Sequence, residues 1–183
     1  MNRKTIYFGT TNEGKLKEAK SVLGINVRPV SLEIDEVQSL DRQEVALKKA
    51  SAYYKKTKKT LFVEDVSLEF SALNGLPGTY IDSFSRALGN KGLISLLHNK
   101  NRKAVAITTL VYIWGINKYK VFEGRVAGTI SEKEKGKGFG WDPIFLPNGS
   151  KKTFGEMSLE EKNKHSMRRK ALEKLRTWLK KSL

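Results

Sequence analysis

Residues 5–24 decide the fold class, and they read TIYFGTTNEGKLKEAKSVLG. The short apolar run Thr5–Gly9 predicts a β-strand. A polar turn follows, and the spacing of apolar residues over Asn12–Leu23 predicts a helix whose end is marked by Gly24. A strand that passes through a polar turn into a helix is typical of α/β proteins.

The rest of the chain alternates strand and helix patterns. Strands are expected over Ile25–Val30, Leu61–Val63 and Leu68–Leu73. Helices are expected from the capping pair Asp41 and Glu44 to about Lys56, over Tyr80–Leu88 and Lys91–Asn99, and after the capping pair Ser158 and Glu161. The runs Ala104–Trp114 and Tyr119–Ile130 flank a short turn and predict an antiparallel hairpin. The pattern predicts an α/β fold with a mixed sheet, in a single domain over residues 1–183.

Charge favours an anionic partner. The 183 residues carry 35 Lys and Arg against 19 Asp and Glu, a formal net charge of +16. The excess concentrates on the segments Lys48–Lys59 and Lys162–Lys181, which are either solvated helix faces or a surface that attracts anionic nucleotides. A nucleic-acid-binding domain is a lesser alternative, since no aromatic side chains interleave with the basic ones as a stacking platform needs.

Cysteine and histidine usage restricts the chemistry of any site. The chain has no cysteine and two histidines, which excludes disulfides, thiol nucleophiles and thiolate metal sites. Any metal is therefore expected on carboxylates. No apolar run approaches the roughly 18 residues that a membrane span requires, so we expect a cytoplasmic protein without a membrane partner.

The polar turn after the first strand suits phosphate. It offers the side chains of Thr10, Thr11, Asn12 and Lys15 at a helix N-terminus, where anions bind well. Residues 9–16 also match the P-loop spacing up to Leu16, which stands where that motif has a magnesium-binding Ser or Thr. A P-loop kinase or ATPase is therefore an alternative, and a plain helix cap with a surface lysine is another.

Two carboxylates are candidate metal ligands. Asp65 follows an apolar strand, where a buried unpaired acid would be costly, so we expect it at a strand end that faces a cleft. Glu36 lies in a polar loop, and a solvated loop acid is the alternative there. Oxygen ligands of this kind suit Mg²⁺, which also keeps several waters.

The segment Gly138–Pro143 suits a flat ligand. Its glycines allow close approach of the backbone, and Phe139 and Trp141 offer aromatic faces on which a base can stack. Asp142 can accept hydrogen bonds from ring N–H groups. The alternative is that both aromatic residues belong to the core.

Taken together, these motifs resemble the inosine/xanthosine triphosphate pyrophosphatase family from Thr10 to about Ala171. The family's Thr-Gly-Asn-x-x-Lys becomes Thr10–Lys15, and its strand-end acid and Gly-x-Pro-Gly turn become Asp65 and Gly75–Gly78. Its Phe-Gly-Trp/Tyr-Asp-Pro becomes Phe139–Pro143. Two positions depart from the pattern, because Thr11 replaces a glycine and Met167 replaces the histidine of Ser-His-Arg.

The resemblance implies two lobes around a long twisted mixed β-sheet with flanking helices, an active-site groove between the lobes, and a homodimer. It implies hydrolysis of ITP, dITP and XTP to the monophosphate and pyrophosphate, with water attacking the α-phosphorus. Mg²⁺ is expected on Glu36 and Asp65, with Asp65 and Lys15 as catalytic residues. The residues expected on the substrate are Thr10, Thr11, Asn12, Lys15 and Lys48 for phosphate, and Phe139, Trp141, Asp142, Lys162 and Arg168 for the base.

Overall fold

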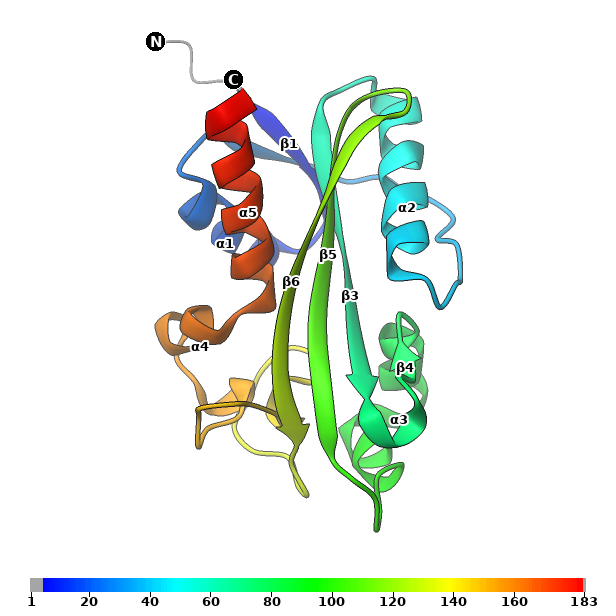
Figure 1. The fold of residues 1–183 in the computed structure, drawn as a ribbon, viewed down its shortest axis with the longest axis vertical. Helices are drawn as coiled ribbons and strands as arrows, with labels where there is room; N and C mark the ends of the chain where they lie inside the picture. Colours follow the sequence, from blue (N-terminus) through cyan, green and yellow to red (C-terminus); the bar gives the residue numbers. More distant parts are fainter. Residues whose placement is uncertain (1–4, 183) are drawn as a thin grey trace. The chain divides into compact units, whose positions relative to one another are not determined.

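The computed structural model describes residues 5–182, which divide into two compact units. Unit 1 comprises Met1–Asp65, Thr108–Gly124 and Arg168–Leu183, and unit 2 comprises Val66–Ile107 and Arg125–Met167. Within the described residues, seven strands form one mixed sheet in the order β2-β1-β3-β5-β6-β7, with β4 paired to β3. The expected α/β class with a mixed sheet and flanking helices is confirmed (Figure 1). The groove and the single domain stay predictions.

Unit 1 is built on the strand, turn and helix with which the sequence pattern begins. Its first elements are β1 (Ile6–Gly9), α1 (Glu13–Leu23), β2 (Val27–Val30) and α2 (Arg42–Thr57). β1 pairs in parallel with β2 and with the start of β3 (Leu61–Phe70). Nearly all of α5 (Met167–Ser182) belongs to this unit.

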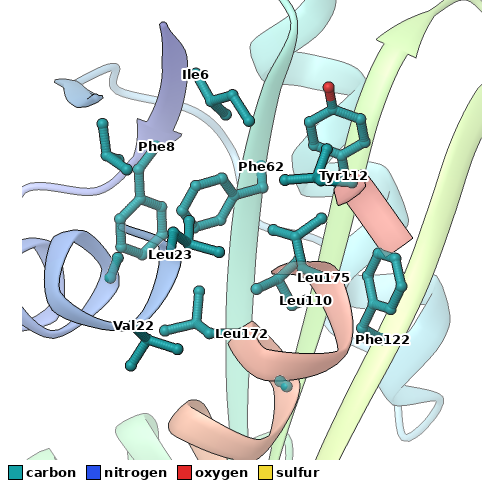
Figure 2. Packing of buried hydrophobic residues seen from close by; sticks show 14 residues of the cluster. Ile6, Phe8, Val22, Leu23, Phe62, Leu110, Tyr112, Phe122, Leu172 and Leu175 are labelled. Atoms are coloured by element: carbon teal, nitrogen blue, oxygen red, sulfur yellow. The ribbon is translucent and has the colours of Figure 1, made fainter. Parts of the chain in front are cut away.

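The sheet of unit 1 is covered on both faces. Phe8 and Phe62 stack with ring centroids 4.3 Å apart, in a core that includes residues of α1 and α5 (Figure 2). Leu61 and Val63 instead pack against buried residues of α2. Side chains alternate along a strand, so residues 61 and 63 face α2, whereas residue 62 faces α1 and α5.

Unit 2 contains the other ends of the long strands and most of the irregular structure. β5 (Lys103–Gly115) and β6 (Lys118–Ile130) are the two strands of the expected hairpin, and each passes from one unit to the other. The remaining elements are β4 (Pro77–Gly78), α3 (Ile81–Ser95), β7 (Phe145–Pro147) and α4 (Leu159–His165), with short 3-10 turns at Ser71–Leu73, Asp142–Ile144 and Phe154–Glu156.

Three expectations need correction or refinement. The strands expected at Leu61–Val63 and Leu68–Leu73 are one strand, β3, so Asp65 lies inside a strand and not at its end. The helices expected on either side of Gly89 form α3, which is kinked there by a φ of 61°. The sequence pattern also predicts that Met167 is buried on one apolar stripe with Ala171 and Leu175. Met167 is buried in the core of unit 2, whereas Ala171 and Leu175 belong to the core of unit 1.

Candidate active site

The turn between β1 and α1, which is expected to bind phosphate, is a hydrogen-bonded helix cap. The side chain of Asn12 accepts a hydrogen bond from the backbone N–H of Lys15 at 3.0 Å, and the hydroxyl of Thr10 accepts one from the N–H of Asn12 at 3.1 Å. The non-glycine positions with positive φ in the described chain do not include Thr11, so threonine replaces the family's glycine there without backbone strain. The turn therefore presents the positive end of the α1 dipole together with Lys15.

Leu16 argues against the P-loop interpretation of this turn. Its side chain packs against the apolar core of unit 1 from the first turn of α1. A hydroxyl at this position would face aliphatic and aromatic side chains instead of a metal ion.

Lys15 ends in a buried network of charges. Its Nζ lies 3.0 Å from Oε1 of Glu64, which is 3% exposed. Arg168 donates from Nε to both oxygens of Glu64, at 3.0 and 2.8 Å, and from Nη1 to Oε2 of Glu18 at 2.9 Å. Burial alone would raise the pKa of Glu64, but the charges of Arg168 and Lys15 outweigh it and lower that pKa to about 2.

Glu36 and Asp65 come together around a lysine of α2. The Nζ of Lys49 lies 2.6 Å from Oε1 of Glu36. Burial raises the pKa of Asp65 to about 6. The charge of Lys49 acts in the opposite direction and lowers this pKa, and the charge of Glu36 raises it. Burial would lower the pKa of Lys49, yet it is raised, because the hydrogen bond and charge of Glu36 outweigh desolvation.

The donor set around Asp65 fits a hard divalent cation. Oδ2 of Asp65 is buried, and no residue of the described structure forms a hydrogen bond with it. A buried carboxylate oxygen without a partner costs free energy, which a cation beside it would recover. Glu36 is close enough to shift the pKa of Asp65 and supplies a second carboxylate. The described residues contain no cluster of three or more acidic or histidine side chains suited to a metal, so water and phosphate oxygens would complete the coordination.

The lysine beside these carboxylates is Lys49, which was not singled out in the sequence, and the expectation that Lys48 contacts phosphate stays a prediction. The side chain of Lys48 is exposed on α2, one position earlier. The helical pattern could have distinguished the two. Ala46, Ala50 and Tyr53 pack in the core cluster that contains Leu61 and Val63, and Lys49 is three residues after the first and four before the last of them.

The residues expected around the base lie in unit 2, except for Arg168. Asp142 accepts hydrogen bonds from the backbone N–H of Phe139 at 3.2 Å and from Nζ of Lys162 at 2.5 Å. Gly138 is required here, because a Cβ would come within 2.6 Å of Cβ of Asp142. These contacts fix the loop and orient the ammonium group of Lys162.

The two aromatic residues of this loop differ in exposure. Phe139 is 77% exposed, so its ring is free to stack on a ligand. Trp141 is 9% exposed and packs edge-on against Phe145, with ring centroids 5.5 Å apart, so it belongs to the core of unit 2. The core alternative therefore holds for Trp141, whereas the stacking role of Phe139 stays a prediction.

Arg168 is placed differently from the other residues expected on the base. It belongs to unit 1, and it contacts the carboxylates of Glu64 and Glu18. Its assignment to the base stays a prediction. Glu64 and Glu18 were not singled out in the sequence, although Glu64 adjoins Asp65 and Glu18 follows Lys15 by three residues on α1.

An α/β sheet that combines a lysine at a helix N-terminus, paired carboxylates and an exposed aromatic loop fits a nucleotide-hydrolysing enzyme. The chain belongs to the Ham1 family, whose family model matches residues 6–178. This confirms the family resemblance, and it does not favour the P-loop alternative.

Relatives and a solved structure support the same family. A dITP/XTP pyrophosphatase of Hyperthermus butylicus is 40% identical over 98% of this chain and 96% of its own length. An inosine triphosphate pyrophosphatase of Kluyveromyces lactis is 36% identical over 98% of this chain and 97% of its own length. The structure of the Staphylococcus aureus Ham1 protein superposes with a TM-score of 0.85 and 29% identity, covering 98% of this chain and 100% of that one.

Proposed function

We propose that this protein hydrolyses the non-standard purine nucleoside triphosphates ITP, dITP and XTP to the nucleoside monophosphate and pyrophosphate. The observation that carries the proposal is the partnerless, buried carboxylate oxygen of Asp65 beside Glu36 and Lys49, in the same unit as the phosphate-binding turn. The names of the relatives, dITP/XTP pyrophosphatase and inosine triphosphate pyrophosphatase, support the choice of substrate and of the bond between the α- and β-phosphates.

In this proposal unit 1 carries the phosphate chemistry. Lys15 and Lys49 neutralise charge on the triphosphate, and the N-terminus of α1 binds phosphate oxygens. Glu36 and Asp65 would hold Mg²⁺, which when bound acidifies water and polarises phosphoryl oxygens. Asp65, with its pKa raised to about 6, accepts a hydrogen bond from the attacking water and orients it toward the α-phosphorus. The bond from that phosphorus to its bridging oxygen breaks, and pyrophosphate leaves.

Unit 2 carries base recognition. Phe139 stacks on the purine, and the ammonium of Lys162, held by Asp142, donates to a 6-oxo group. The same donor would meet a repelling 6-amino group in ATP. Sites that pair buried polar groups with the substrate can discriminate strongly against an analogue that leaves those groups unpaired.

A substrate panel tests this function. With Mg²⁺ present, ITP, XTP and dITP should each give kcat/KM at least about 10-fold above that of ATP, because the base contact contributes about one charged hydrogen bond. Equal turnover of ATP and ITP would contradict the assigned base preference. Release of IDP as a stable first product would contradict the assigned bond.

The proposal also includes a homodimer and a cytoplasmic location. The family resemblance supports the first, and the lack of cysteine supports the second. None of the described helices is long and apolar enough to cross a membrane. Light scattering of the purified protein and fractionation of cells test these two statements.

A further inference from the structure

We propose that Glu64 is a positioning residue for Lys15, and that Arg168 holds Glu64 in place. The inference rests on the proposed function, since it gives Lys15 its place on the phosphates.

The geometry begins with the alternation of β3. Glu64 is two residues after Phe62, so its side chain leaves the sheet on the face that α1 and α5 cover. Lys15 and Glu18 are three residues apart on α1 and therefore share one face of that helix. Arg168 reaches the same point from the start of α5. Three elements thus converge on one carboxylate.

The charges of the network compensate one another. Glu64 and Glu18 carry one negative charge each, and Lys15 and Arg168 one positive charge each. A buried carboxylate needs a charged, hydrogen-bonded partner, and Arg168 supplies that partner to both oxygens of Glu64. Glu64 therefore does not depend on Lys15 alone for a counter-charge, and it stays paired with Arg168 when Lys15 also contacts an incoming phosphate.

The network also restricts where the ammonium group of Lys15 can be. A lysine side chain is long and loses much rotamer freedom when it is fixed. The contact with Oε1 of Glu64 fixes the ammonium near the N-terminus of α1 and uses one of its three N–H donors. The side chain keeps 26% of its surface exposed, so the other donors are accessible from solvent. Glu64 thereby orders Lys15 before substrate arrives.

Arg168 is fixed by the two carboxylates that it contacts. Its side chain is 13% exposed, and Nε and Nη1 are both occupied by carboxylates. Because guanidinium geometry is planar, these two contacts fix the plane of the group.

A double-mutant cycle tests this role. The variants are Glu64→Gln, Lys15→Ala and the combination, each assayed for kcat and KM with ITP and checked for cooperative unfolding. Glu64→Gln should lower kcat/KM by about 10- to 100-fold when Lys15 is present, and by less than about 3-fold when Lys15 is already alanine. Equal fold losses in both backgrounds would overturn the inference, because a purely structural role does not depend on Lys15.

Two further variants complete the design. Arg168→Lys keeps the positive charge but cannot contact Glu64 and Glu18 at the same time. If Glu64→Gln does not unfold cooperatively, Arg168→Lys takes its place in the double-mutant cycle. Glu173→Gln removes an exposed ion-pair partner of Arg169 on the same helix and should leave kcat/KM within about 2-fold. A wild-type protein that does not hydrolyse ITP would contradict the proposed function, whereas an active wild type with an additive cycle would contradict only the role given to Glu64.

Discussion

Glu64 and Asp65 are neighbours in the chain, yet their carboxylates have opposite properties. Glu64 faces α1 and α5, where Arg168 and Lys15 outweigh burial and lower its pKa to about 2. Asp65 faces the side of α2, where burial dominates and raises its pKa to about 6. Glu64 is thus held ionised by cations, whereas Asp65, the next residue of β3, is costly to ionise without a cation.

Asp65 should show a conflict between stability and activity. Asp65→Asn should lower kcat at least about a hundredfold, because it removes a charged ligand and the group that orients water. The same change should raise the free energy of unfolding of the metal-free protein at pH 7 by about 1–3 kcal/mol, because a carboxylate with a pKa raised to about 6 opposes folding when ionised.

The sign of the pH dependence follows from the raised pKa of Asp65. The folded state holds the proton of Asp65 more tightly than the unfolded state does. The free energy of unfolding of the wild type therefore falls as the pH rises from about 4 to about 6, and that of Asp65→Asn lacks this fall. Denaturant titrations in EDTA across this range measure the difference. A variant that turns over like the wild type, or that is less stable at pH 7, would refute the assignment.

Phe139 tests the stacking role at a single exposed ring. Phe139→Ala should reduce kcat/KM for ITP by about 10- to 100-fold, since stacking on an aromatic ring is worth about 1–3 kcal/mol per base. Its melting temperature should change little, because the ring is 77% exposed. Tyr119→Ala, which removes an exposed aromatic ring from β6, is the control and should remain fully active. Wild-type kinetics in Phe139→Ala would exclude the stacking role.

At the scale of elements, the register of α2 places Lys49 beside Glu36. Lys49 lies beside Glu36 and on the side of the buried face, whereas Lys48 is exposed. A step of one residue turns the side chain by about 100° around the helix.

The two adjacent lysines form a matched pair for mutagenesis. Lys49→Ala should lower kcat/KM for ITP by about 10-fold or more, because it removes the cation between the carboxylates and the phosphates. Lys48→Ala, with the same loss of charge on the same helix, should stay within about 2-fold. Steady-state kinetics at fixed Mg²⁺ compare them, and the reverse order of effects would support the assignment first made from sequence.

At the scale of the whole molecule, the sequence predicted the elements better than their detailed ends. Hydrophobic periodicity and capping residues located α1, α2, α4 and the β5–β6 hairpin. The pattern split β3 in two, because Glu64 and Asp65 interrupt its apolar run. Only the tertiary partners Arg168 and Lys15 make an acid acceptable there, and these lie far away in the sequence.

Only the local features of the candidate site could be predicted from the sequence. Local motifs identified Asn12 as the cap of α1 and Phe139 as a ring that is free to stack. Motifs left open whether Trp141 is a core residue, and they did not indicate that Arg168 is held by two carboxylates. Those facts depend on packing and on pairs more than a hundred residues apart, for which one sequence carries no signal.

In the proposed reaction, water attacks the α-phosphorus of a non-standard purine triphosphate. Hydrolysis of ITP in water enriched in oxygen-18, followed by mass spectrometry of both products, tests it most directly. We predict one heavy oxygen in IMP and none in pyrophosphate, in equal amounts of the two products. Label in pyrophosphate, or in orthophosphate released with IDP, would contradict the account.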